Sequence, residues 1–362
     1  MRITRWVMFM LVLVPCFLQG EPVISGYLDS SVSLGAGTGS NPAFLYGLEE
    51  YANIRLQARS REGAVFYGSL NLIAASGTYA ETGALLGMVA GENYAAALEL
   101  ERLYFKVSQE RIDFQGGLMR MAFGYGFAFG PMDFLNPRNP LLPDARPRAV
   151  LGADLAYYPA ENSKVLGFTA APRNPFAGSG AGTLGGLAGE YHGDRLSLQG
   201  LYAYQSPHDA FVWGIHRFGL SLKGDLVLGL AAELLYTYDP QTPAREDGLA
   251  ASAGFDYTFP GGKFYVLAEY LYAGDDASTA VSLGFKGNHY LFAQGLYRFS
   301  DYTSLGLGCM AAPEDRSFTP IITAEHELFQ GLTLSLSGQI PLPPDADAGR
   351  YFQGLIKARL RF

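Results

Sequence analysis

The feature that most constrains this chain is a two-residue alternation of apolar and polar side chains that recurs in many separate segments. In residues 226–238 every even-numbered residue is apolar or aromatic, whereas the other face carries Gly229, Glu233 and Thr237. A period of two places alternate side chains on opposite faces of a β-strand. The alternation continues beyond the about 5 to 6 residues of a common soluble strand and reaches the length of a tilted strand that crosses a membrane. The sequence therefore predicts long strands with one apolar face.

The connections between these segments alternate between short and long. Eight links have the composition of tight turns, and nine longer loops fall between them. Seventeen connections predict about 18 strands (16–18), with both chain termini at the tight-turn end. Short turns at one end, long loops at the other and an even number of strands are typical of outer-membrane β-barrels. The tight links are residues 60–63, 108–111, 160–163, 192–195, 223–225, 260–262, 300–302 and 329–331.

Composition agrees with strands and excludes several classes of protein. Charged residues make up 17% of the 362 residues and aromatic residues 14%, and beyond residue 20 no apolar stretch reaches the length of a membrane-spanning helix. A formal net charge of −8 argues against a nucleic-acid partner, because phosphate binding needs a cationic surface. Tyr and Phe gather near segment ends, as at Tyr236 and Tyr238, where the aromatic girdles of membrane barrels lie.

The amino terminus predicts export. Arg2 and Arg5 precede an apolar run over residues 6–18, which a polar break follows. This order is typical of a secretory signal peptide, so we expect a signal peptide over residues 1–20 and a single barrel domain over residues 21–362. The alternative is that the apolar run stays in place as an anchor helix.

The carboxyl terminus, taken with these features, supports a resemblance. Residues 356–362 alternate apolar and polar side chains and end on Leu360, Arg361 and Phe362. The chain resembles the outer-membrane porin-type β-barrels of diderm bacteria. The resemblance implies an all-β fold, a transmembrane antiparallel up-and-down β-barrel surrounded by outer-membrane lipid. It also implies that the barrel assembly machinery recognises the ending at Leu360 and Phe362. A homo-oligomer is a further expectation.

If the apolar faces point outward, the polar alternates line the lumen. The period breaks at 101–102 and again at 116–117, which predicts a β-bulge at each break. The two bulges would turn Met119 and Met121 outward and the neighbouring basic residues inward. The predicted lumen residues are Arg55, Arg59, Arg102, Lys106 and Arg120 on the early strands, and Glu233, Asp256 and Glu269 on later ones. The alternative is that these charges only solvate the lumen or pair with one another.

The third long loop, residues 127–147, is the strongest candidate for a functional segment. It is rich in proline, which lowers the conformational entropy of the free chain, so we expect it to be ordered. In porins the third outer loop commonly folds inward and sets the constriction, and the resemblance implies the same here. The alternative is an outer loop that packs on its neighbours. Its charged residues are Asp133, Arg138, Asp144 and Arg146, with Arg148 just beyond.

The sequence contains no pattern of a known catalytic site. The five histidines are scattered, and no HExxH, CxxC or GxSxG motif occurs. We therefore expect no enzyme and no cofactor or metal. The predicted function is an outer-membrane channel for passive diffusion of small hydrophilic solutes or ions. The alternative is a non-conducting barrel that serves as a surface adhesion or scaffold protein, or as a transporter of hydrophobic substrates.

Overall fold

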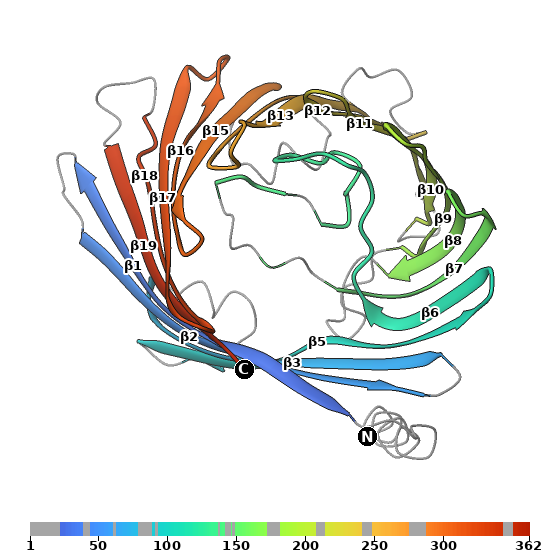
Figure 1. The fold of residues 1–362 in the computed structure, drawn as a ribbon, viewed down its shortest axis with the longest axis horizontal. Helices are drawn as coiled ribbons and strands as arrows, with labels where there is room; N and C mark the ends of the chain where they lie inside the picture. Colours follow the sequence, from blue (N-terminus) through green and yellow to red (C-terminus); the bar gives the residue numbers. More distant parts are fainter. Residues whose placement is uncertain are drawn as a thin grey trace.

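The computed structural model describes most of the chain after the predicted signal peptide, and its strands form one closed sheet. The described residues are 22–38, 44–60, 63–78, 89–90, 93–136, 138–141, 146, 149–171, 182–207, 214–240, 248–274, 287–342 and 350–362. Every neighbouring pair of strands is antiparallel, and β1 pairs with both β2 and β19, which closes the barrel (Figure 1).

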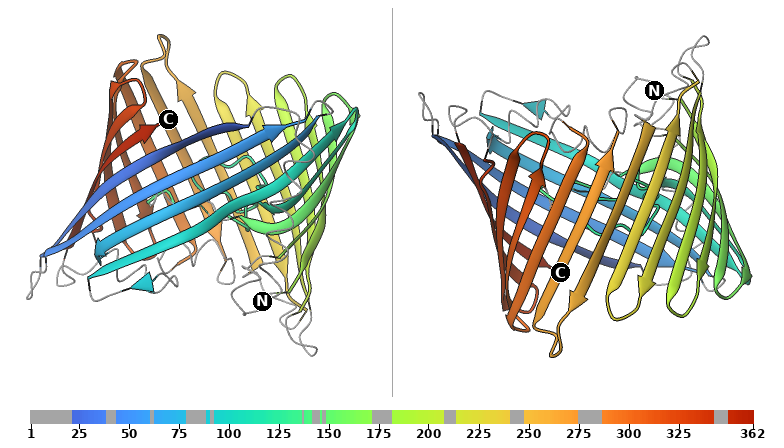
Figure 2. Two further views of the ribbon diagram at one scale, coloured as in Figure 1. Left: turned by 90° about the horizontal axis from the view of Figure 1, so that it is seen from below. Right: turned by 90° about the horizontal axis from the view of Figure 1, so that it is seen from above.

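The barrel wall has 18 long strands, as the sequence predicts, and the two-residue β4 pairs with the start of β5. The strands are β1 (Val23–Thr38), β2 (Phe44–Arg59), β3 (Ala64–Gly77), β4 (Val89–Ala90), β5 (Tyr94–Gln109), β6 (Ile112–Met119), β7 (Val150–Ala160), β8 (Ser163–Ala171), β9 (Leu184–His192), β10 (Leu196–Gln205), β11 (Ile215–Asp225), β12 (Gly229–Tyr238), β13 (Leu249–Thr258), β14 (Phe264–Ala273), β15 (His289–Ser300), β16 (Thr303–Ala312), β17 (Ser317–Phe329), β18 (Leu332–Gln339) and β19 (Arg350–Arg361). Figure 2 shows them inclined to the barrel axis.

The two ends of the barrel differ as the connection lengths predict. Seven of the eight predicted tight links coincide with short connections, and the eighth lies slightly later, at residues 226–228. The first strand begins and the last strand ends at this tight-turn end, where the backbones of Gly26 and Phe362 exchange two hydrogen bonds of 2.9 and 3.1 Å. Among the described residues, no helix is long and apolar enough to cross a membrane.

The register separates an apolar outer face from a polar inner one. Leu187, Leu220 and Leu307 point outward and are more than half exposed, whereas Asn53 and Ser221 point inward and are fully buried. Because side chains alternate along each strand, one residue of slip would exchange these two faces, and the apolar pattern therefore fixes the register.

One of the two predicted β-bulges is confirmed. Opposite β3, Ser69 pairs with Arg102 and Leu70 with Leu100, so Glu101 is the extra residue on β5. This bulge keeps Arg102 on the inner side, as the sequence predicts.

The second predicted bulge, at 116–117, is wrong. The pairing of Gly116 and Gly117 with β5 and with β7 runs without a shift. Gly117 instead adopts a φ of 129°, which a side chain would not permit, and the chain leaves the wall after β6. Met119 and Met121 consequently face inward, at 0% and 6% exposure, where apolar side chains of the following loop cover them.

Candidate functional site

The chain between β6 and β7 runs through the inside of the barrel (Figure 1). We call residues 120–149 the third loop; its described residues are 120–136, 138–141, 146 and 149. Two apolar clusters inside the barrel join it to the wall. One contains Met121, Phe123 and Met132 of the loop and side chains of β6 to β10 and of β12, and the other contains Phe129 and side chains of β13 to β16.

Polar side chains of the wall accept hydrogen bonds from the backbone of the third loop. We call these four residues the docking strip: Gln199 on β10, Ser221 on β11, Glu233 on β12 and Glu269 on β14. Gln199 is the register partner of Ser221, which is also the register partner of Glu233. Three acceptors therefore lie side by side on consecutive strands and meet the loop together.

Glu233 binds the loop through both carboxylate oxygens. Oε1 accepts the N–H of Gly126 at 2.5 Å, and Oε2 accepts the N–H of Met132 at 3.2 Å. The carboxylate approaches the loop so closely that a Cβ at Gly124 would lie 2.2 Å from Oε1. Gly124 also has a φ of 85°, so both the space and the backbone require glycine there.

Glu269 is the second anchor. Its Oε2 accepts the N–H groups of Ala128 at 2.5 Å and of Phe129 at 3.0 Å, and the side chain is 1% exposed. Hydrogen bonds to an ionised acceptor are roughly twice as strong as neutral ones. The two other contacts of the strip join Gly124 N to Gln199 Oε1 at 2.5 Å and Tyr125 N to Ser221 Oγ at 3.0 Å.

The third loop also holds itself together. Arg138 Nη1 donates to the carbonyl of Gly126 at 2.5 Å, and Asn136 Nδ2 donates to the carbonyl of Met121 at 2.7 Å. Asp133 is 4% exposed. Its burial raises the pKa of the carboxyl to about 7, and the nearby Arg138 guanidinium opposes this rise.

Basic and aromatic side chains gather on a different part of the wall. We call them the basic strip: Arg55 on β2, Arg102 on β5, Arg120 just after β6 and Arg359 on β19. Arg55 and Arg359 lie over the ring of Tyr27, with Cζ 5.2 and 4.5 Å from its centroid, and Arg102 lies 5.7 Å from that of Tyr67. Such contacts fix guanidinium groups without neutralising their charge.

Glu101, the extra residue of the bulge, is the centre of this strip. It forms ion pairs with Arg120 and, at 3.6 Å, with Arg102. Its Oε2 also accepts hydrogen bonds from Asn53 at 2.8 Å and Ser69 at 2.9 Å. One carboxylate therefore balances part of the charge of two arginines.

Further predicted residues also pair on this side. Lys106 Nζ lies 2.7 Å from Asp113 Oδ2. Arg146 of the third loop lies 2.7 Å from Glu49 and 3.4 Å from the ring centroid of Tyr51. The far end of the third loop is thereby joined to β2.

The remaining predicted residues lie apart from both strips or outside the described residues. Arg59 is exposed at the tight-turn end of β2, and Asp256 faces inward on β13 opposite Gly229. Asp144 and Arg148 lie outside the described residues. At the carboxyl end, Leu360 and Phe362 face outward and are 38% and 58% exposed.

Five residues that belong to these strips or contact them are not predicted by the sequence. Gln199 and Ser221 are uncharged alternates that resemble any other inward residue, and at Glu101 the sequence indicates only a bulge. Asp29 and Arg359 form a bidentate ion pair, with both contacts at 2.7 Å, across the seam between the first and last strands. The up-and-down topology alone could have placed those two residues together.

No model of a known protein family matches the sequence, and no curated protein matches it. Solved structures do share the fold. OccK2 (OpdF) of Pseudomonas aeruginosa superposes with a TM-score of 0.62 at 11% identity, over 96% of this chain and 98% of that one. OccK7 (OpdD) of the same organism gives 0.60 at 10% identity, over 94% and 99%. A mutant of the porin of Rh. blastica gives 0.52 at 14% identity, over 94% and 100%. The chain therefore has the fold of an outer-membrane porin-type β-barrel.

Proposed function

We propose that the protein is an outer-membrane channel that passes small hydrophilic solutes or ions by diffusion through a lumen narrowed by the third loop. The observation that carries this proposal is the docking of that loop inside the barrel, opposite a wall of arginines. The docking strip covers the loop on one side, and the basic strip then lines the remaining passage. We propose that the predicted residues within the two strips act as constriction residues, and that Arg138 braces the loop while Lys106 and Arg146 line its ends; Arg59 and Asp256 lie apart from the constriction.

The outer face supports a place in a lipid bilayer. Its exposed leucines and aromatic residues would face lipid, and each long strand pairs with a neighbour on both sides in a closed wall, as a sheet in lipid requires. We propose export by residues 1–20, which lie outside the described residues, followed by insertion into the outer membrane.

Single-channel recording tests the proposed function. Refolded protein in a planar bilayer should give current steps of discrete size in KCl, because water and ions fill an open lumen. A difference in gel mobility between boiled and unboiled samples checks that the barrel is closed. A heat-modifiable barrel that gives no current steps would contradict the channel and favour the non-conducting alternative.

We also propose that the carboxyl-terminal strand carries the signal for the barrel assembly machinery. Phe362 faces outward at the tight-turn end and its backbone pairs with that of Gly26. Deleting Phe362 should lower the amount of folded barrel in the outer membrane while export continues, measured by fractionation and band shift. Deleting Glu21, which directly follows the predicted signal peptide, is the control. If the Phe362 deletion variant reaches the outer membrane in the same amount as the wild type, the proposal is wrong.

One outward residue favours a contact between copies of this chain. Glu50 on β2 is an acidic residue that faces outward, and it accepts a hydrogen bond from Ser30 at 2.6 Å. Its outward neighbours across β3 and β5 are the small residues Ala74 and Ala96. A charge facing hydrocarbon is costly, so we propose a homo-oligomer that covers this face. Glu50→Leu should then lower the oligomeric mass in light scattering, and a monomeric wild type would contradict the proposal.

A further inference from the structure

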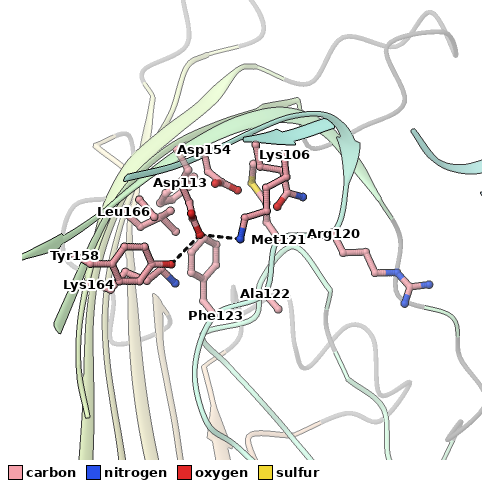
Figure 3. Close-up of a pocket in the computed structure, with 13 residues that line it drawn as sticks. Lys106, Asp113, Arg120, Met121, Ala122, Phe123, Asp154, Tyr158, Lys164 and Leu166 are labelled. Carbon is pink, nitrogen blue, oxygen red and sulfur yellow. Dashed lines mark hydrogen bonds and ion pairs between the residues drawn. The ribbon is translucent and has the colours of Figure 1, made fainter. Parts of the chain in front are cut away.

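A side cavity opens between the barrel wall and the first residues of the third loop (Figure 3). Its volume is about 200 Å³, and β5 to β8 together with residues 120–123 enclose it. Asp113 and Tyr158, which line it, lie close to tight turns, so the cavity is on the tight-turn side of the third loop. A solute that had passed the loop would meet it next.

The polar wall of the cavity contains two groups without partners. Lys106, Gln115 and Asp154 are register neighbours on β5, β6 and β7, so they form a row across three strands. Within the described part of the chain, neither Asp154 nor Gln115 makes a side-chain hydrogen bond or ion pair, and both are only partly buried. By contrast, Lys106 pairs with Asp113, and Lys164 pairs with Glu190 at 2.9 Å.

The opposite wall of the cavity is apolar. Phe168 is the register partner of Asp154 on β8, so the apolar wall begins directly beside the carboxylate. Leu166 comes from the same strand, and Met121 and Phe123 come from the third loop. Figure 3 shows Leu166 on the wall and Met121 and Phe123 on the loop. The cavity therefore offers a cation, an amide, an anion and an apolar surface within one small space.

We propose that this cavity is a binding subsite for a zwitterionic solute of the amino-acid class that carries an apolar side chain. The inference rests on the proposed channel for its route of access. The ammonium group of the solute would bind the Asp154 carboxylate, its carboxylate would bind Lys106 and the Gln115 amide, and its side chain would pack on Phe168. The lining is mostly charged and polar with one apolar side, which matches a small solute that is charged at one end and apolar at the other.

Charge selects a zwitterion over a simple cation. Lys106 and Lys164 both act electrostatically on Asp154 without reaching ion-pair distance. A bare cation at Asp154 would be repelled by these two ammonium groups to the extent that their own partners, Asp113 and Glu190, leave their charge unbalanced, and it would leave Lys106 and Gln115 without a ligand. A solute that also carries a carboxylate offsets this repulsion. Its carboxylate lies beside Lys106 at one end of the row, and its ammonium group lies beside Asp154 at the other.

Equilibrium binding of L-leucine to the refolded barrel tests the subsite. Three probes each lack one group: 4-methylpentanoate lacks the ammonium, 3-methylbutylamine lacks the carboxylate, and glycine lacks the side chain. L-leucine should bind more tightly than all three. Asp154→Asn should weaken L-leucine binding about 10- to 100-fold, the usual value of a hydrogen bond to a charged group, and leave 4-methylpentanoate binding unchanged. Asp256→Asn, which removes an inward carboxylate elsewhere, should change neither.

A second variant fills the cavity without removing a charge. Ala156→Phe should abolish L-leucine binding while the current steps persist, because Ala156 lines the cavity from β7 and does not belong to the third loop. Equal affinity for L-leucine and glycine, or unchanged affinity in Asp154→Asn, would overturn the subsite. Because equilibrium binding needs no current, the two proposals fail separately. Current steps without L-leucine binding overturn only the subsite, and binding without current steps overturns only the channel.

Discussion

Carboxylates on two parts of the lumen wall have different partners. On β12 and β14, Glu233 and Glu269 accept hydrogen bonds from backbone N–H groups of the third loop. On β5, Glu101 instead pairs with two arginines and accepts hydrogen bonds from two neutral side chains. A carboxylate bound to backbone fixes the path of the chain, whereas one paired with guanidinium groups sets the local field. Glutamates thus fix the path of the loop on one side of the lumen and adjust the local charge of the wall on the other side.

Burial separates the two groups further. Glu233 and Glu269 are 3% and 1% exposed, so losing either would leave buried N–H groups without acceptors, at about 1–3 kcal/mol each. The Arg102 and Arg120 side chains are 21% and 28% exposed. Their charge reaches the water of the lumen, where salt screens it within roughly 10 Å at 0.1 M. Changes at the docking strip should therefore alter geometry, and changes at the basic strip should alter selectivity.

The largest effect is expected when both anchors are removed. Glu233→Ala combined with Glu269→Ala leaves four N–H groups of the third loop without their acceptors. The loop should leave the lumen, single-channel conductance should rise severalfold, and added protease should cut within residues 124–132. Asp256→Ala is the matched control, because it removes an inward carboxylate for which no bond to the loop occurs among the described residues. Unchanged conductance in the double variant would show that the apolar clusters alone hold the loop.

The next prediction concerns the basic strip. Arg102→Gln with Arg120→Gln removes two positive charges and leaves the Glu101 carboxylate without its ion pairs, so reversal potentials in asymmetric KCl should shift towards cation selectivity. Adding Glu101→Gln should reverse much of the shift. The shift should also shrink at 1 M salt, where the screening length is about 3 Å. A reversal potential that stays at the wild-type value while conductance is intact would mean that these arginines do not face the pathway.

The sequence predicts the wall better than it predicts the contacts within it. Alternation and connection lengths are local, and they are sufficient for the 18 strands and for the bulge at Glu101. They fail at Met119 and Met121, because apolar residues also face inward where a loop covers them. They cannot distinguish Glu233 from Glu101 either. The partners of Glu233 lie more than 100 positions away in the chain, and only the folded loop brings them there.

The smallest effect is expected from a third kind of carboxyl, which belongs to the loop itself. Burial raises the pKa of Asp133 from 3.8 to about 7. The folded state therefore binds a proton that the unfolded chain releases near pH 4, and the resulting stabilisation is complete below pH 4 and lost as the pH rises to about 7. Between these limits stability should fall by about 1.4 kcal/mol per pH unit from this group.

The heat-induced band shift measures this loss. Its midpoint temperature should fall in the wild type between pH 5 and pH 8, and it should fall less in Asp133→Asn, whose amide does not titrate. Neutralising Arg102 should leave the fall as it is in the wild type, because the basic strip does not contact Asp133 in the described part of the chain. An equal fall in the wild type and in Asp133→Asn would assign the pH dependence to another group. If the fall is smaller in Asp133→Asn alone, the titrating group lies in the loop that the docking strip holds. The stability of that loop is then independent of the arginines that set the selectivity.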